Sequence, residues 1–334
     1  MVALPMRRPA ANAAARSDRR AERTLGALSF AVLGLIALMV VTVLIKSWAS
    51  FSHNGLAWFG SGAEPDASMR AMRDSTPLAG HSIYYFRAWP LIWGTLVTTL
   101  PAVLIALVVS TLAAVFLTEF APGAMRRVLE PVVRLLAGVP SIVYGLIGIL
   151  ALAPWIERSF ISDARKQSVI QVVQLNGNNL STGAVILAVM ILPIMVAITM
   201  NALIAVPSSW KEGSAALGVN RWRTIWRVSL RTARPAIVAG IILATARALG
   251  EAVMLDLVAG SRDFAANPLD GSTFLFEPVR PLAATIFQES GGLSIGVLSH
   301  TLYAIAAVLL VSATLLSFAG WAAKQSMARY GMGG

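Results

Sequence analysis

Cysteine is absent from this 334-residue chain, and histidine and charged residues are scarce. Without cysteine the chain can form neither a disulfide nor a thiolate nucleophile or thiolate metal site. The three histidines, His53, His81 and His300, do not show metal-ligand spacing, so we expect no metal site. Charged residues make up 13% of the chain, about half the usual share in soluble domains. This scarcity argues against a water-soluble protein.

Long apolar stretches take the place of the missing charge, and 57% of the residues are hydrophobic. A helix needs about 20 apolar residues to cross a hydrocarbon core about 30 Å thick. Five stretches without Asp, Glu, Lys or Arg hold a segment of that length: 24–45, 88–118, 135–156, 167–210 and 290–323. A sixth, roughly Pro235 to Ala259, is equally apolar but carries three charged residues. The sequence therefore predicts an all-α membrane protein with six transmembrane helices.

Lysine and arginine are unevenly divided between the two sides of these predicted spans. Both terminal segments and the two connections on their side hold 17 of the 27 cationic residues, whereas the opposite side holds nine. Cytoplasmic segments retain positive residues, so both termini are predicted to be cytoplasmic. The net charge of +11 then reflects topology and contact with anionic lipid, not nucleic-acid binding. We divide the chain into a basic cytoplasmic tail, residues 1–23, expected to be disordered, and a transmembrane domain, residues 24–334.

The cytoplasmic connection at about 207–234 is too elaborate for a simple link between two helices. Ser209 and Glu212 have the spacing of a capping box, and Gly218 can end the resulting short helix in a left-handed conformation. Trp222 and Trp226, four residues apart, share one face of a second helix. Two interpretations remain open at this point. The segment is either a hairpin in the headgroup region, where Trp and Arg are common, or a docking element for a cytosolic partner.

Part of this connection resembles the EAA loop of ABC importer permeases. The resemblance consists of Glu212-Gly213-Ser214, then Gly218, and later Val228-Ser229-Leu230. Gly213 and Ser214 stand where that family usually has alanines, and Arg231 stands where it has proline. In the family this loop forms a coupling helix that enters a cleft of the ATPase. The resemblance therefore implies ATPase coupling through these residues: Glu212, Gly213, Ser214, Gly218, Trp222 and Leu230.

The charged span carries Arg247 and Glu251, which point the same way if the helix is continuous. Arg247 lies roughly 20 Å along the axis from Arg234, deep within the span. Such a charge must face protein or water and indicates a functional site by default. Asp256 is about half a turn away around the axis and is expected at the outer mouth. The pair is either an internal ion bridge or part of an anion pathway, in which Arg offers bidentate geometry to an oxyanion.

Three stretches resemble phosphate ABC importer permeases, and the second is more similar to the PstC type than to the PstA type. They are Leu136-Ala137-Gly138-Val139-Pro140-Ser141-Ile142-Val143-Tyr144-Gly145, the run from Arg247 to Glu251, and Pro281-Leu282-Ala283-Ala284-Thr285-Ile286. The resemblance implies the type I ABC importer permease architecture in a bacterial cytoplasmic membrane. It also implies that Arg247 and Glu251 take part in phosphate translocation.

The family resemblance implies several partners as well. They are a second, PstA-like permease subunit, a PstB-like ATPase dimer and an extracytoplasmic, PstS-like phosphate-binding protein. None of the four lysines follows a glycine, so the chain has no Walker A motif and should not hydrolyse ATP. No cofactor is expected in this chain, because ATP and Mg would bind the partner ATPase. Membrane lipid is the remaining expected contact.

Three alternatives to a phosphate permease stay open from the sequence. The charged span does not exclude an ABC permease for another oxyanion such as sulfate or molybdate. An ion-coupled secondary transporter would use the Arg247 and Glu251 pair as a gate. A membrane enzyme is the weakest alternative, because the chain shows neither a nucleophile elbow nor a carboxylate pair with hydrolytic geometry.

Overall fold

The computed structural model describes residues 10–62, 64–171, 173–262 and 265–328, and this part is almost entirely helical. Six of its helices are long and apolar enough to cross a membrane, which confirms the predicted number. They run over Ala21–Phe59, Trp89–Phe120, Ser141–Phe160, Leu180–Ile204, Arg221–Leu249 and Gly296–Ala322. Residues 1–9 of the predicted tail lie outside the described residues.

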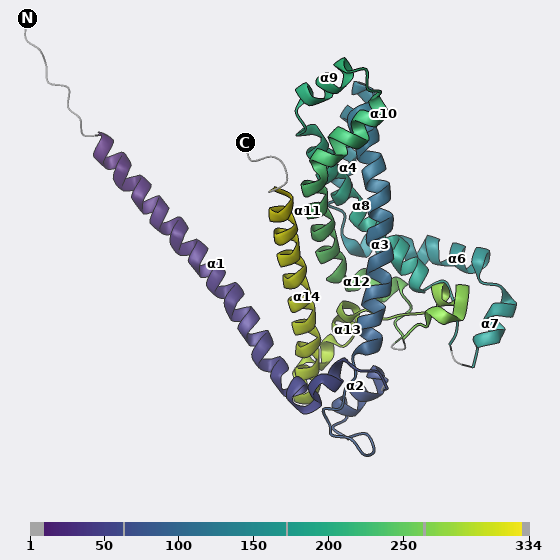
Figure 1. Cartoon of the computed structure of the whole chain (residues 1–334). Helices are drawn as coiled ribbons and strands as arrows, with labels where there is room; N and C mark the ends of the chain where they lie inside the picture. The colour runs from purple at the N-terminus through teal and green to yellow at the C-terminus, as the bar shows by residue number, and fades with distance from the viewer. Residues whose placement is uncertain (1–9, 63, 172, 263–264, 329–334) are drawn as a thin grey trace, which may run out of the picture.

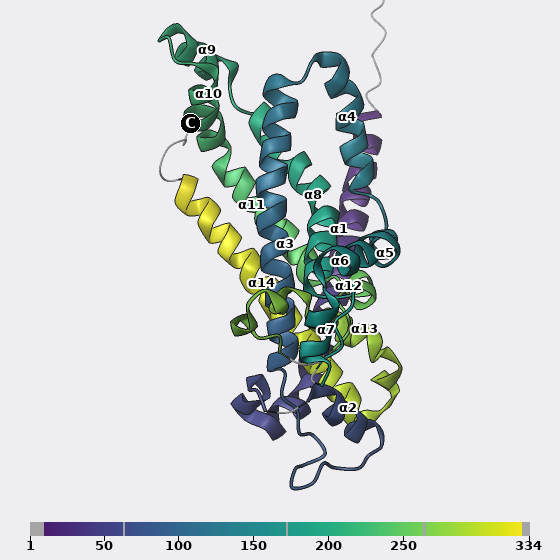
Figure 2. The same ribbon diagram turned by 90° about the vertical axis from the view of Figure 1, so that its right-hand side faces the viewer.

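The long helices run between two ends of the molecule (Figures 1 and 2). One end carries the short helix α9 (Ser208–Ala216) and the beginning of α10 (Arg221–Thr224). The other end carries α2 (Pro65–Arg73). Both α1 (Ala10–Asn54) and α14 (Gly296–Ala328) have their outer termini toward the α9 end, as an even number of spans requires.

The first helix, α1, leans away from the bundle and packs on α14 (Figure 1). None of the residues in its most apolar window is buried within the chain. The helix begins at Ala10, so residues 10–23 of the tail that was expected to be disordered are helical. Alanine and arginine are strong helix formers, and no glycine or proline interrupts them there.

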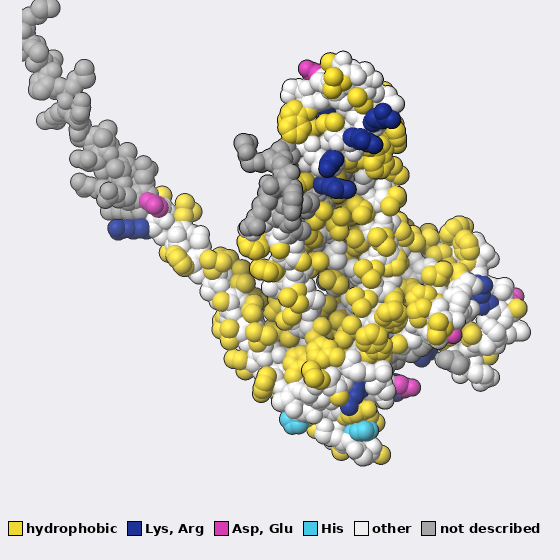
Figure 3. Space-filling model, in the orientation of Figure 1, with side chains coloured by type: hydrophobic (Ala, Val, Ile, Leu, Met, Phe, Trp, Pro, Cys, Tyr) yellow, Lys and Arg dark blue, Asp and Glu magenta, His cyan; other side chains and the backbone are white. Residues whose placement is uncertain are grey.

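The centre of the bundle is formed by α3 (Trp89–Val115) and α8 (Leu180–Ile204), which pack along each other. α11 (Leu230–Leu249) lies against both and also against α14. Hydrophobic side chains cover most of the visible face of these helices, and charged ones gather toward the two ends (Figure 3). That distribution is typical of helices surrounded by lipid or by other apolar helices.

The π turn η2 (Phe116–Phe120) continues α3. Between η2 and α8 lie four shorter helices and a second π turn, and this segment includes the third span, Ser141–Phe160. In chain order they are α4 (Gly123–Leu136), α5 (Ser141–Ile147), the π turn η3 (Gly148–Leu152), α6 (Ala153–Phe160) and α7 (Asp163–Val169). α5 packs closely on α12 (Val253–Val258). A Cβ atom at Gly148 would lie 2.6 Å from Cγ1 of Val258, so only glycine fits this contact.

The α2 end is built from segments on either side of α3 and before α14. The 3-10 helix η1 (Gly55–Phe59) precedes α2, and the later segment contains η5 (Pro268–Phe276), α13 (Leu282–Gln288) and η6 (Ser290–Ser294). α2 is a short helix of nine residues at the surface of this end. Its apolar side, with Met69 and Met72 buried, faces a core cluster that also contains Trp58.

Candidate functional site

The helix that carries Arg247 ends before Glu251. α11 stops at Leu249, and Gly250 is its C-cap, with φ −85° and ψ 0°. The next helix, α12, begins only at Val253. The prediction that Arg247 and Glu251 share one face of a continuous helix is therefore wrong, because the backbone leaves the helix between them. Figure 1 shows this break about midway between the two ends of the molecule.

Glu251 is buried in the break, with 8% of its surface exposed. Its Oε1 accepts a hydrogen bond from the backbone N–H of Met254, at 3.3 Å. The carboxylate thus satisfies a backbone donor in the first turn of α12, which offsets part of the cost of burying it. In this conformation Glu251 stabilises the broken helix and makes no ion pair with Arg247.

Arg247 lies in the last turn of α11 and is exposed on the surface of this chain. Within the part of the chain that the structure describes, its side chain forms neither an ion pair nor a hydrogen bond. A positive charge is favourable near a helix C-terminus. Apolar contacts do not enclose the guanidinium, so it faces the space outside the packing of this chain. At membrane depth that space must be water or another protein subunit.

The three stretches that resemble phosphate permeases meet around this break. Tyr144 of the first, Ala248 of the second and Ala284 of the third belong to one buried cluster. A Cβ atom added at Gly145 would lie 2.9 Å from the side chain of Leu257 on α12, so α5 approaches the break closely. The residues that the sequence singled out separately thus form one continuous region.

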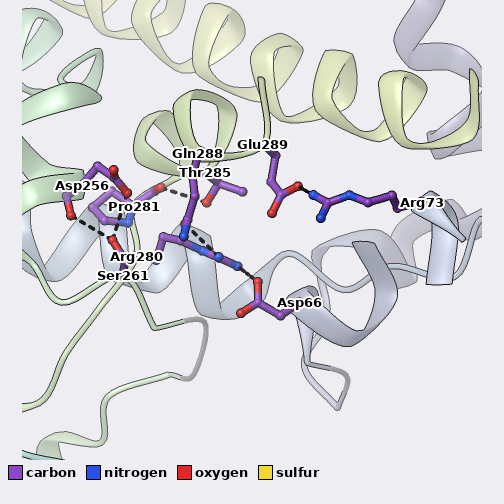
Figure 4. A network of polar contacts seen from close by, with 9 residues as sticks. All are labelled: Asp66, Arg73, Asp256, Ser261, Arg280, Pro281, Thr285, Gln288 and Glu289. Carbon is purple, nitrogen blue, oxygen red and sulfur yellow. Dashed lines mark hydrogen bonds and ion pairs between the residues drawn. The ribbon is translucent and has the colours of Figure 1, made fainter. Parts of the chain in front are cut away.

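Asp256, which was expected at the outer mouth, makes its side-chain contact with Ser261 in the turn after α12. Its carboxylate accepts a hydrogen bond from the hydroxyl of Ser261, at 2.9 Å, and the same hydroxyl also contacts the Asp256 carbonyl (Figure 4). Ser261 has a positive φ of 48°. The side chain of Asp256 therefore holds the turn that follows α12.

The predicted coupling helix exists as α9, but it starts differently from the prediction. Its N-cap is Pro207, which makes no side-chain capping bond, and the helix begins at Ser208. Ser209 therefore lies inside the helix, and Glu212 lies beyond the position that a capping box requires. Among the described residues Glu212 has no bonded partner, and both it and Gly213 are exposed. The predicted capping box is wrong, and the exposed glutamate stays available to a partner.

Gly218 ends α9 in the left-handed conformation that the sequence predicted, with φ 74°. The N–H of Val219 donates to the carbonyl of Ser214, at 3.2 Å, as in a Schellman motif. The Ser214 hydroxyl also lies 2.8 Å from the hydroxyl of Thr224 on α10. Ser214 is thus the contact that joins the two arms of the loop.

Trp222 and Trp226 lie on a helix that continues directly into the membrane span. α10, the π turn η4 (Ile225–Ser229) and α11 follow one another without a break. The two rings are 54% and 53% exposed and pack edge to face, 6.0 Å apart. Leu230, by contrast, packs against a buried cluster between α3, α8 and α11. Lys and Arg side chains gather beside α10 in Figure 3.

Arg280 is a buried cation that was not among the residues predicted to be functional. It is 2% exposed, pairs with Asp66 on α2, and donates from Nη1 to Oε1 of Gln288 at 3.1 Å (Figure 4). A second ion pair, Arg73 with Glu289, joins the same two segments. Here α2 supplies the cation, whereas in the first pair it supplies the carboxylate. The two ion pairs hold α2 across α13. The position of Arg280 directly before an apolar run was the only available sequence signal.

The sequence matches a family profile and several related permeases. The sequence profile of the family described as binding-protein-dependent transport system inner membrane component matches residues 110–324. The probable ABC transporter permease protein YqgH of Bacillus subtilis is 32% identical over 311 residues, which cover 90% of each chain. The phosphate transport system permease protein PstC of Mesorhizobium japonicum is 32% identical over 299 residues, covering 86% of this chain and 85% of the relative.

Solved structures of ABC transporters share the fold at low sequence identity. A chain of the bacterial alginate ABC transporter, in complex with an alginate-bound periplasmic protein, superimposes with a TM-score of 0.54 at 12% identity. The alignment covers 94% of this chain and 96% of that one. A chain of the inward-facing MetNI methionine ABC transporter gives a TM-score of 0.52 at 18% identity, with coverage of 72% and 96%.

Proposed function

Since the chain belongs to the family of binding-protein-dependent transport system inner membrane components, we propose that it is a permease subunit of an ATP-driven phosphate importer. The family and the six apolar helices make it a multi-pass protein of the bacterial inner membrane. It is a transport component, not a catalytic enzyme. The architecture is that of a type I ABC importer permease, as predicted.

The observation that carries the proposal is the exposed position of Arg247 at the end of α11. This residue lies in the last turn of α11, beside the helix break, and its side chain is exposed on the surface of its own chain. Guanidinium groups bind tetrahedral oxyanions through two parallel hydrogen bonds, which a single ammonium cannot do. Phosphate in transit would accept these bonds from Arg247. Glu251 would keep the break in shape through its bond to the first turn of α12.

A second permease would complete the path on the side to which Arg247 points. A single chain leaves this cation uncovered at membrane depth, where water or protein must face it. A PstA-like subunit of the same fold is the partner of fitting chemistry, because it would line the opposite wall of a wet passage. The substrate would arrive from a PstS-like phosphate-binding protein at the α2 end.

Energy would reach the permease through α9. The exposed Glu212 and Gly213 on this helix would dock into a PstB-like ATPase dimer, which binds ATP and Mg. ATP binding would bring the two ATPase subunits together, move α9 and open the spans outward. Hydrolysis would return them to the inward-open state. Replacing Glu212 by alanine should then weaken ATPase docking, and unchanged recovery of the ATPase with that variant would refute this assignment.

Reconstitution tests the proposal against its alternatives. Proteoliposomes holding this chain, the second permease and the ATPase should take up labelled phosphate only with ATP inside and the phosphate-binding protein outside. Excess sulfate or molybdate should compete poorly. Uptake of sulfate or molybdate in place of phosphate would indicate a different oxyanion. Collapse of uptake on dissipating a proton gradient, with ATP held constant, would indicate a secondary transporter.

A further inference from the structure

The short helix α9 has no buried residue, so apolar packing contributes little to its attachment to the bundle. One ion pair connects it directly to the end of a core helix. Nζ of Lys211 on α9 lies 2.5 Å from Oε1 of Glu119. Glu119 belongs to the π-helical turn η2 (Phe116–Phe120), which continues α3 at the α9 end. The two residues are 92 positions apart in the sequence.

The surroundings of this pair show that it bridges a gap between the two elements. The side chain of Glu119 is 11% exposed and that of Lys211 is 30% exposed, so solvent screens the pair only in part. A cavity of about 230 Å³ lies beside them, and Ala215 and Val219 are among the residues that line it. Close packing therefore does not fix α9 to η2 here, and the distance between the two depends on the charged pair.

A second contact supports the same connection from α10. The guanidinium of Arg221 lies over the ring of Phe120, 4.7 Å from its centroid. This cation–π contact holds the start of the fifth span against η2. It supports α9 only indirectly, because α9 is joined to α10 through the turn at Gly218 and the bond between Ser214 and Thr224.

Glu119 lies at the end of the helix whose middle faces the translocation site. Ala102 and Ala106 of α3 belong to the same buried cluster as Ala248, the residue next to Arg247. A rigid α3 would therefore carry a displacement at η2 to the region of the helix break. Buried helix interfaces move as units, because packed cores are not continuously deformable.

We propose that Glu119 is a positioning residue and that its ion pair with Lys211 is a strut, which transmits the movement of α9 to α3 during the ATPase cycle. This inference rests on the proposed docking of an ATPase on α9. With the strut intact, α9 and α3 move together. Without it, α9 follows the ATPase while α3 stays behind, and ATP is hydrolysed without transport.

The first test measures coupling in proteoliposomes that contain the complete complex. Lys211→Met and Glu119→Gln should each lower the amount of phosphate taken up per ATP hydrolysed by about five-fold or more, while the ATPase still co-purifies. The charge swap, Lys211→Glu with Glu119→Lys, should recover most of the loss, as a purely local packing role would not allow. Arg227→Met, which removes an exposed cation of the same loop, should leave the ratio unchanged.

A second experiment tests the strut without measuring phosphate uptake, by following the distance between α9 and α3. Because the chain has no cysteine, spin labels can be placed at Ala216→Cys on α9 and Leu112→Cys on α3 alone. On ATP addition their distance should stay constant in the otherwise unchanged complex and should change in the Lys211→Met complex. A constant distance and a normal coupling ratio in Lys211→Met would refute the strut. So would a loss that the charge swap does not recover. If the parent complex hydrolyses ATP but moves no phosphate, the proposed substrate is wrong, and the label distances still decide the strut.

Discussion

Gly218 offers a perturbation whose cost can be worked out from the structure. Its φ of 74° lies in the left-handed region, and a Cβ atom built there meets nothing within 4 Å. Alanine would therefore cause backbone strain without any steric clash. That strain costs about 1–2 kcal/mol. α9 has no buried residue, so no packing energy is available to hold the turn in place.

The predicted consequence is weaker docking of the ATPase. A cost of about 1–2 kcal/mol lowers the population of correctly ended α9 by a factor of roughly 5–30. The dissociation constant of the ATPase for the detergent-solubilised permease pair should rise by up to that factor with Gly218→Ala. Asparagine tolerates the left-handed conformation better than alanine, so Gly218→Asn should weaken docking less.

Gly213→Ala is the matched control, because ABC importer permeases usually carry alanine at this position of the docking helix. Gly213 lies in the same helix, and its added Cβ atom also meets nothing within 4 Å, but its φ is not positive. Glycine to alanine in a helix gains about 0.5–1 kcal/mol, so α9 should form at least as well. Equal docking by Gly218→Ala and the parent chain, or an equal loss in both alanine variants, would refute the reasoning.

Two further predictions concern the α2 end. Arg280→Ala removes a buried side chain together with its ion pair to the partly exposed Asp66, and should lower the unfolding free energy by about 1–3 kcal/mol. Arg73→Ala, whose side chain is 46% exposed, should cost under about 1 kcal/mol. Thermal unfolding in detergent compares the two variants, and similar losses would contradict a larger contribution of the buried Arg280–Asp66 pair. Burial raises the pKa of Glu277, and the nearby Asp270 adds to the rise. The folded chain then holds this proton more tightly than the unfolded one, so stability falls as pH rises from the ordinary Glu pKa through the raised one. Glu277→Gln should weaken that fall, and an identical pH dependence in both proteins would contradict it.

Features that depend on short segments were predictable from the sequence. The six spans followed from apolar runs of sufficient length, because crossing a bilayer is a requirement that each segment meets alone. The left-handed end of α9 followed from Gly218, since few other residues adopt that conformation without strain. The capping box failed by a small shift, because Pro207 and not Ser209 occupies the N-cap, so α9 begins two residues early.

Features that depend on distant partners could not be predicted. Nothing near Arg280 in the sequence shows that Asp66, 214 positions away, would bury and pair with it. Likewise, no sequence feature indicated that Lys211 would pair with Glu119, 92 positions away. The break at Gly250 was missed for another reason. A single glycine in an apolar run is tolerated in many helices, and only the packing of α5 and α12 shows that the helix ends there.

Phosphate uptake by Arg247 variants tests the central claim most directly. In proteoliposomes with the complete complex, Arg247→Ala should lower ATP-driven uptake by on the order of 10- to 100-fold, the value of a charge-assisted hydrogen bond, while the ATPase still co-purifies. Arg247→Lys should recover only part of the rate, because lysine lacks the bidentate geometry. Arg234→Ala, an exposed cation on the same helix, should transport normally. Unimpaired phosphate uptake by Arg247→Ala would show that this guanidinium does not line the path.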